Sequence, residues 1–136
     1  MSTLDSPSIE VRWDGPRATL LVDGAESSCI DTSDPSYLDF EYMQHATCTL
    51  QATFPSSAPL RVLHLGGAAC ALPWAWSILF PSSRHTVVEI SPKIASFARE
   101  NFDLPRSPIL KIRIGEARAV IDSLRDSSFD VIVRDA

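Results

Sequence analysis

The sequence has few cysteines and no cluster of basic residues. Its 136 residues include three cysteines, Cys29, Cys48 and Cys70, which are odd in number, widely spaced and without a CxxC pair. This pattern favours neither a disulfide framework nor a zinc site, and we expect no metal cofactor. The chain carries 12 Lys and Arg against 17 Asp and Glu. Because a phosphate-binding surface needs clustered cations, nucleic acid is not expected as a partner.

A long apolar run is also missing. The longest such run, residues 71–80, is about half a membrane span and is followed by Pro81. The opening residues MSTLDSP contain neither a basic nor an apolar region, so they are not typical of a signal peptide. We therefore expect a cytoplasmic protein with no membrane partner. The apolar content of 45% and charged content of 21% are typical of a globular chain with a real core.

The first third of the chain has the pattern of short strands joined by tight turns. Apolar and polar residues alternate, and Asp14-Gly15-Pro16 and Asp23-Gly24 are typical turn sequences. These observations predict an antiparallel β meander within residues 1–34, with strands at 8–13, 18–22 and 25–32. Asp34-Pro35 then has the pattern of a helix start, an N-cap followed by proline. The residues that recur at helical spacing up to Phe54 are Leu38, Tyr42, His45 or Ala46, and Thr49 or Leu50.

After the linker at 55–59, short apolar runs alternate with helical segments. The pattern predicts strands at 60–65, 85–90, 109–114 and 129–133, and helices at 72–80, 92–102 and 116–124. Such alternation is typical of a parallel, doubly wound sheet. We therefore predict an α/β fold in which residues 35–136 form an incomplete Rossmann-like domain. The chain stops at the end of its last strand, so we expect an N-terminal piece of a longer protein.

Candidate site residues follow the four predicted strands in succession: Gly66-Gly67, Glu89, Glu116 and Asp135. In an open α/β sheet, ligands bind at the carboxyl ends of the strands. Glycines after the first strand allow close backbone approach to a ligand, although a plain tight turn would also use them. Glu89 lies 23 residues after Gly66, a spacing typical of an acid that binds ribose hydroxyls; the alternative is a solvated strand-end carboxylate.

The remaining candidates have equally specific alternatives. Glu116 could bind an adenine edge or simply stabilise a helix N-terminus. Asp135 could hold or deprotonate an attacking amine, or be a turn residue. Cys70 could be reactive at a helix N-terminus, but a small buried packing residue is the favoured interpretation. His45 is interpreted as a core or interface histidine.

Four segments resemble, in order, those of the spermidine synthase family, the polyamine aminopropyltransferases. VLHLGG, VVEISPKIASFARENF, IRIGEAR and FDVIVRDA are similar to that family's VLIIGGGDGG loop, VEID strand, GDG or GDA segment and DVIIVDS strand. The meander and the helix containing Glu41-Tyr42-Met43 and His45 resemble the family's small β domain and the helix after it. The resemblance covers residues 20–136 and only the first part of the family's catalytic domain.

The resemblance implies a sulfonium nucleoside, decarboxylated S-adenosylmethionine, as co-substrate and a small-molecule amine as acceptor. Glu89 would then hold the ribose, Glu116 and Ala117 would lie near the adenine, and Asp135 would face the amine. Ala69 stands where the family has an aspartate that would help to bind the aminopropyl amine.

Three functions remain open from the sequence. The first is aminopropyl transfer to a polyamine, and the second is methyl transfer from S-adenosylmethionine, because one scaffold, loop and ribose acid serve both reactions. The third is a truncated nucleoside-binding module without catalysis. Exposed strand edges make a homodimer a further hypothesis.

Overall fold

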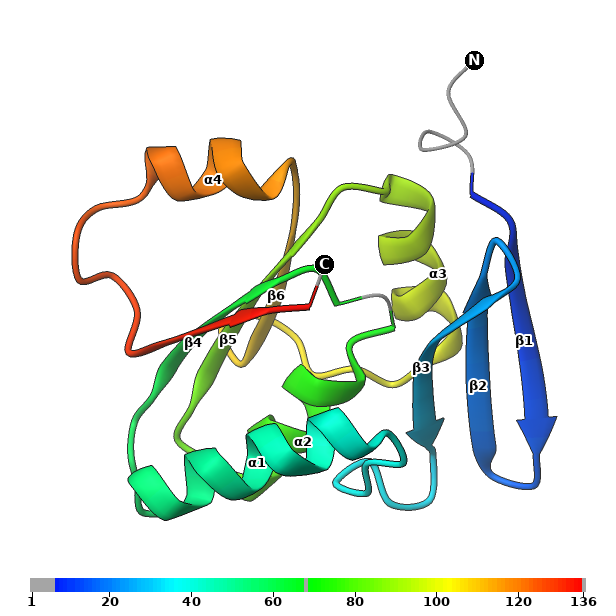
Figure 1. The fold of residues 1–136 in the computed structure, drawn as a ribbon, viewed down its shortest axis with the longest axis horizontal. Helices are drawn as coiled ribbons and strands as arrows, with labels where there is room; N and C mark the ends of the chain where they lie inside the picture. Colours follow the sequence, from blue (N-terminus) through cyan, green and yellow to red (C-terminus); the bar gives the residue numbers. More distant parts are fainter. Residues whose placement is uncertain (1–6, 68, 136) are drawn as a thin grey trace.

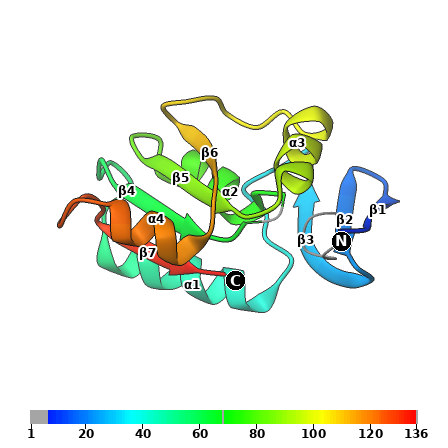
Figure 2. The same ribbon diagram turned by 90° about the horizontal axis from the view of Figure 1, so that it is seen from above.

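Residues 7–67 and 69–135, which the computed structural model describes, form two separate β-sheets (Figures 1 and 2). The small sheet is antiparallel, in the order β1-β2-β3, with β1 at Ile9–Asp14, β2 at Arg17–Val22 and β3 at Ala25–Asp31. Both connecting turns use residues with positive φ, Gly15 in the first and Asp23 and Gly24 in the second. The predicted meander is therefore present.

The large sheet is parallel and has the strand order β6-β5-β4-β7. Its strands are β4 (Arg61–Leu65), β5 (Arg84–Glu89), β6 (Leu110–Ile114) and β7 (Val131–Arg134). The connecting helices are α2 (Ala71–Leu79), α3 (Pro92–Asn101) and α4 (Ala117–Ser123). The predicted α/β fold with a parallel, doubly wound sheet is confirmed.

Helices cover both faces of this sheet. Consecutive residues of β4 alternate between the faces: Val62 belongs to the main core with α1 and α2, whereas Leu63 packs with Val120 of α4. Figure 1 shows α4 on one side of the sheet and α1 and α2 on the other. Because β4 is buried on both faces, its sequence shows no regular alternation of apolar and polar residues, and its polar His64 is buried as well.

The helix predicted to start at Asp34-Pro35 starts later. Helix α1 spans Glu41–Thr53, and Asp34-Pro35 belongs to a turn in which Tyr37 N donates to the Asp34 carbonyl oxygen at 3.0 Å. Proline suits the second position of such a turn as well as the first position of a helix, and the Asp34 carboxylate accepts from Ser36 N instead of capping a helix.

The buried face of α1 also differs from the predicted one. Met43, Thr47 and Leu50 are buried, whereas Tyr42 is 52% exposed. The side chain of His45 is mostly exposed, with Nε2 3.6 Å from Glu41 Oε1. Of the two interpretations of His45, core or interface, the core interpretation is therefore wrong. Leu50 of the expected stripe is buried, but Met43 and Thr47, which is polar in the sequence, take the buried positions in place of Tyr42.

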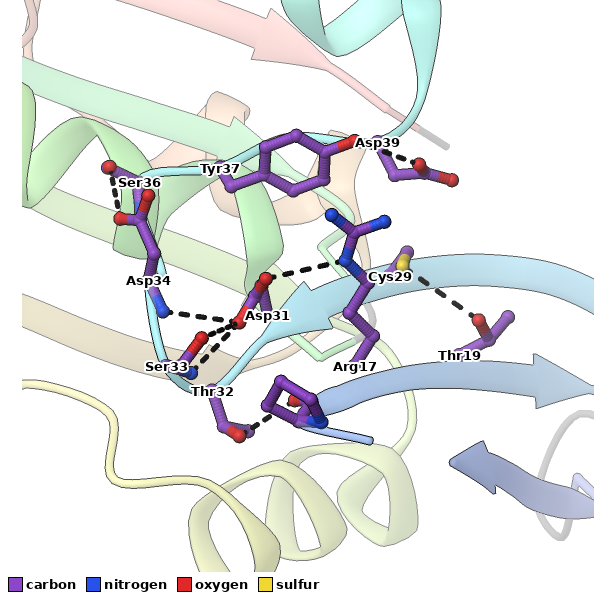
Figure 3. Close-up of polar contacts among 11 residues, drawn as sticks. Arg17, Thr19, Cys29, Asp31, Thr32, Ser33, Asp34, Ser36, Tyr37 and Asp39 are labelled. Atoms are coloured by element: carbon purple, nitrogen blue, oxygen red, sulfur yellow. Dashed lines mark hydrogen bonds and ion pairs between the residues drawn. The ribbon is translucent and has the colours of Figure 1, made fainter. Parts of the chain in front are cut away.

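A polar cluster joins the small sheet to the segment that leads into α1 (Figure 3). The Asp31 carboxylate accepts from Ser33 N, Ser33 Oγ, Asp34 N and, at 3.4 Å, from Arg17 Nε. These bonds, first that of the Ser33 hydroxyl, lower the pKa of Asp31. The Arg17 guanidinium also lies 4.4 Å from the centre of the Tyr37 ring. The cluster therefore ties β2 and β3 to the chain that carries α1.

Three polar side-chain contacts are buried in the core next to β4. His64 Nε2 is 2.9 Å from His85 Nδ1, and Ser83 Oγ is 2.7 Å from His85 Nε2. Since the Ser83 hydroxyl donates to the Phe80 carbonyl oxygen, it accepts from His85, and His85 in turn accepts from His64. On the same face, Trp76 Nε1 donates to Thr47 Oγ1 at 2.8 Å.

Candidate functional site

A cleft of about 540 Å³ opens at the carboxyl ends of the parallel strands. All six residues predicted to form the site line it: Gly66, Gly67, Glu89, Glu116, Ala117 and Asp135. The cleft lies where the chain order of the sheet reverses, since β5 and β6 lie on one side of β4 and β7 lies on the other. This reversal point is the usual ligand site of an open α/β sheet, because the loops from the central strands diverge there.

The loop after β4 needs both of its first two glycines. Gly66 has φ of 85°, a conformation that side-chain-bearing residues rarely adopt. At Gly67, a Cβ atom would lie 2.7 Å from Val87 Cγ1. The loop therefore passes directly over β5, and its backbone lines the cleft without an intervening side chain.

The rest of the loop is bonded within the protein. Ala69 N donates to Ser28 Oγ of β3 at 3.3 Å, and Cys70 N donates to the Gly67 carbonyl oxygen at 2.7 Å. Cys70 is the N-cap of α2, is 1% exposed, and has its pKa raised to about 12 by burial. Such a thiol is not a nucleophile, and the interpretation of Cys70 as a packing residue is confirmed. Residue 68 lies outside the described residues.

Glu89 ends β5 and is buried at 8% exposure. Its Oε2 accepts from Ser91 N at 2.9 Å, which fixes the carboxylate at the strand end. Ser91 is itself the N-cap of α3, because Ser91 Oγ accepts from Ile94 N. Among the described residues no buried side-chain oxygen lacks a partner, so Glu89 Oε1 keeps access to the cleft. One oxygen is held by the backbone, and the other is free to accept from a ligand.

Glu116 is the N-cap of α4. Oε1 accepts from Arg118 N at 3.0 Å and Oε2 from Ala119 N at 2.9 Å, and these bonds, in that order, lower the pKa of Glu116. The alternative role considered from the sequence, stabilising a helix N-terminus, is therefore present. Each carboxylate oxygen has a second lone pair, so the cap leaves room for a ligand bond. Ala117 follows at the first turn of α4 and lines the same cleft.

Asp135 and Tyr42 form a pair across the cleft floor. Tyr42 Oη donates to Asp135 Oδ1 at 3.1 Å, and Asp135 N donates to the Leu65 carbonyl oxygen. Burial raises the pKa of Asp135, and the hydrogen bond from Tyr42 opposes that rise. Burial, followed by the charge of Asp135, raises the pKa of Tyr42 to about 12. The tyrosine therefore stays a hydrogen-bond donor at neutral pH.

Sequence reasoning missed three polar residues of the cleft: Tyr42 from α1, and Glu26 and Ser27 from β3. Tyr42 lies 93 residues before Asp135, so only the packing of α1 beside β7 brings them together. Glu26 and Ser27 belong to the small sheet, whose strand pattern does not indicate that it borders the cleft. The helix spacing did single out Tyr42, but as part of an apolar face.

The charge of the cleft has one sign. Four carboxylates line it, those of Glu26, Glu89, Glu116 and Asp135, and its lining within the described residues includes neither Lys nor Arg. Carboxylates that share a partly enclosed space attract cations and repel anions. The cleft is therefore suited to a cationic ligand with hydrogen-bond donors.

Among residues 7–67 and 69–135, no helix is long and apolar enough to cross a membrane. Within the same residues, His, Cys, Asp and Glu side chains form no group of three that could hold a metal ion.

Comparison with known proteins places the chain near one family. It is 29% identical over 97 residues to a polyamine aminopropyltransferase of Vibrio vulnificus, a match that covers 70% of this chain. The crystal structure of a probable spermidine synthase from Corynebacterium glutamicum is similar over 96% of the chain, with 38% identity and a TM-score of 0.87. No protein-family model matches the sequence.

A methyltransferase is also similar in fold. The human methyltransferase-like protein 13, solved in complex with SAH, matches 71% of the chain with 25% identity and a TM-score of 0.63. The chain spans 32% of the length of the Vibrio relative, 49% of the Corynebacterium protein and 47% of the human one. The similarity therefore concerns one part of each of these proteins.

Proposed function

Because the chain is similar to spermidine synthases in sequence and fold, we propose that it binds decarboxylated S-adenosylmethionine for aminopropyl transfer to a small amine. The observation that carries this proposal is the single cleft that gathers Gly66, Gly67, Glu89, Glu116, Ala117 and Asp135. Glu89, with one carboxylate oxygen free, holds the ribose hydroxyls. Glu116 and Ala117 lie at the adenine, and the glycine loop allows the nucleoside to approach the backbone.

The charge of the cleft supports the decarboxylated donor. That donor carries a sulfonium and a primary ammonium, both positive, whereas S-adenosylmethionine adds a negative carboxylate. The described part of the lining has four carboxylates and neither Lys nor Arg, which favours the first ligand over the second. The preference is electrostatic, so it weakens as the salt concentration rises.

In the proposed reaction, the neutral nitrogen of the acceptor attacks the aminopropyl carbon bonded to sulfur. The C–N bond forms as the C–S bond breaks, and its electron pair returns to sulfur to leave a neutral thioether, methylthioadenosine. The leaving group needs no acid, so the protein contributes positioning and removal of one proton from the amine. Asp135 accepts that proton, with its carboxylate held in place by Tyr42.

Methyl transfer is the second candidate, and Ala69 favours it. This residue is buried at 1% exposure and stands where the resemblance implies an acid for the aminopropyl amine. The likeness to methyltransferase-like protein 13 supports the same alternative. The fold serves both reactions equally well. The two candidates are therefore distinguished by which donor binds, the decarboxylated one or S-adenosylmethionine with its negative carboxylate.

Calorimetry on the purified chain distinguishes the candidates. Tighter binding of decarboxylated S-adenosylmethionine than of S-adenosylmethionine is expected, together with release of methylthioadenosine when putrescine is added. The reverse preference would overturn aminopropyl transfer in favour of methyl transfer. Binding without product would leave a nucleoside-binding module, the third hypothesis, and no binding to either nucleoside would reject all three.

We further propose a cellular location and an oligomeric state. We place the protein in the cytoplasm and propose pairing between two copies, for which the open edges of β1 and β7 offer unpaired backbone groups. We also propose that the chain divides into a β unit at 1–34 and a nucleoside-binding unit at 35–136, because each unit contains one of the two sheets. Sedimentation equilibrium would detect the dimer.

A further inference from the structure

Strand β3 departs from regular pairing at Ser27. Along the β2–β3 ladder, Leu20 pairs with Ser28 and Leu21 pairs with Glu26, so Ser27 is an extra residue on β3. This arrangement is a β-bulge. Bulges redirect side chains and are frequent beside functional sites.

The bulge turns two consecutive side chains toward one space. In a regular strand, neighbouring residues point to opposite faces, yet Glu26 and Ser27 both line the cleft. The next residue, Ser28, is buried and accepts from Ala69 N at 3.3 Å. The small sheet is thereby held against the glycine loop and supplies a wall of the cleft.

Glu26 is close to the loop end of the cleft. It precedes Ser28 by two residues, about 7 Å along a strand, and Ser28 contacts the loop directly. Figure 1 shows the turn between β2 and β3 on the same upper side as the carboxyl end of β4. Glu26 and both glycines of the loop line the same cleft, and Ala69 of that loop carries no charge.

The carboxylate of Glu26 has no cationic partner among the ion pairs of the described residues. Glu89, Glu116 and Asp135 each accept a hydrogen bond within the protein, from backbone groups or from Tyr42, whereas none to the Glu26 carboxylate occurs among the described residues. We propose that the β3 bulge makes Glu26 the binding site for a primary alkylammonium group of the ligand. This inference rests on the proposed function and adds the residue that recognises the amine.

The test compares Glu26→Gln with wild type by calorimetry at low ionic strength, using three probes. Decarboxylated S-adenosylmethionine carries the alkylammonium on the donor, putrescine carries it on the acceptor, and methylthioadenosine carries none. Glu26→Gln is expected to weaken one amine-bearing probe by roughly fivefold, the size of one exposed charge pair. Methylthioadenosine should bind both proteins equally.

The matched control is Glu10→Gln, an exposed glutamate of the same sheet that pairs with Arg12 outside the cleft. It should leave all three affinities unchanged. A loss confined to the donor, or one confined to putrescine, supports the inference and identifies which molecule brings the amine. Equal affinities of Glu26→Gln and wild type for both amines would overturn it.

Failure of the proposed function can be distinguished from failure of the inference about Glu26. If wild type binds none of the nucleosides, that proposal falls, while putrescine still tests Glu26.

Discussion

Tyr42 Oη lies 3.1 Å from Asp135 Oδ1, across 93 residues of sequence. The pair joins α1, which leads from the small sheet, to the end of β7, the last strand of the large sheet. Through this hydrogen bond, the position of α1 affects Asp135, the proposed proton acceptor. Its removal provides the most direct test of how Asp135 is controlled.

Tyr42→Phe should lower kcat/KM by roughly fivefold to tenfold, the effect of losing one exposed hydrogen bond of about 1 kcal/mol. The bond from Tyr42 lowers the pKa of Asp135, so its loss raises that pKa further. Less carboxylate is then present at a given pH, and the acid limb of the pH–rate profile moves to higher pH.

The matched control is Tyr37→Phe, which removes a hydroxyl bonded to Asp39 outside the cleft. An unshifted acid limb in Tyr42→Phe, or an equal shift in Tyr37→Phe, would argue against the role of the pair.

Gly67→Ala should destabilise the fold by about 1–3 kcal/mol, the usual cost of overpacking. The new methyl group would meet Val87 Cγ1 at 2.7 Å, well inside contact distance. Chemical denaturation measures the loss. The double variant Gly67→Ala with Val87→Ala removes the clash and should show less destabilisation than the two single variants added together. Strict additivity would mean that the contact does not limit the loop.

Thr47→Val should cost about 1–3 kcal/mol, because it leaves the buried indole N–H of Trp76 without an acceptor. The control is Thr49→Val on the same helix, whose exposed hydroxyl bonds only to the His45 carbonyl oxygen. Urea denaturation followed by tryptophan fluorescence compares the two variants. Equal losses would show that helix propensity, not the buried bond, sets the effect.

Stability should fall as the pH drops from about 6.5 toward 4. Burial lowers the pKa of His85 to about 4, and burial followed by the neighbouring His85 lowers that of His64 well below 6.5. In the unfolded chain both imidazoles protonate near pH 6.5. The stability that the neutral pair provides is therefore complete above that pH and is lost below it, with up to about 3 kcal/mol from His85.

Denaturation midpoints measured between pH 4 and 8 give the acid limb of the stability profile, which is the fall in stability below about pH 6.5. His85→Gln should make it shallower, whereas His45→Gln, which changes the exposed histidine, should leave it unchanged. A limb that does not respond to His85→Gln would assign the acid sensitivity to the carboxylates.

Much of the fold follows from local patterns in the sequence. The turns at Gly15 and Gly24 and the alternation of apolar runs with helices depend on neighbouring residues, and each was predicted close to its observed place. Asp34-Pro35 was an exception, because the same dipeptide suits a turn and a helix start.

The sequence by itself determined the strand ends, and with them Gly66, Glu89, Glu116 and Asp135, because residues at the carboxyl ends of parallel strands must share one edge. Only the tertiary structure decided which distant groups complete the cleft. Tyr42 enters through the packing of α1, and Glu26 through a bulge in a second sheet. Such contacts depend on how whole elements pack and on one extra residue in a ladder, neither of which leaves a periodic pattern in the chain.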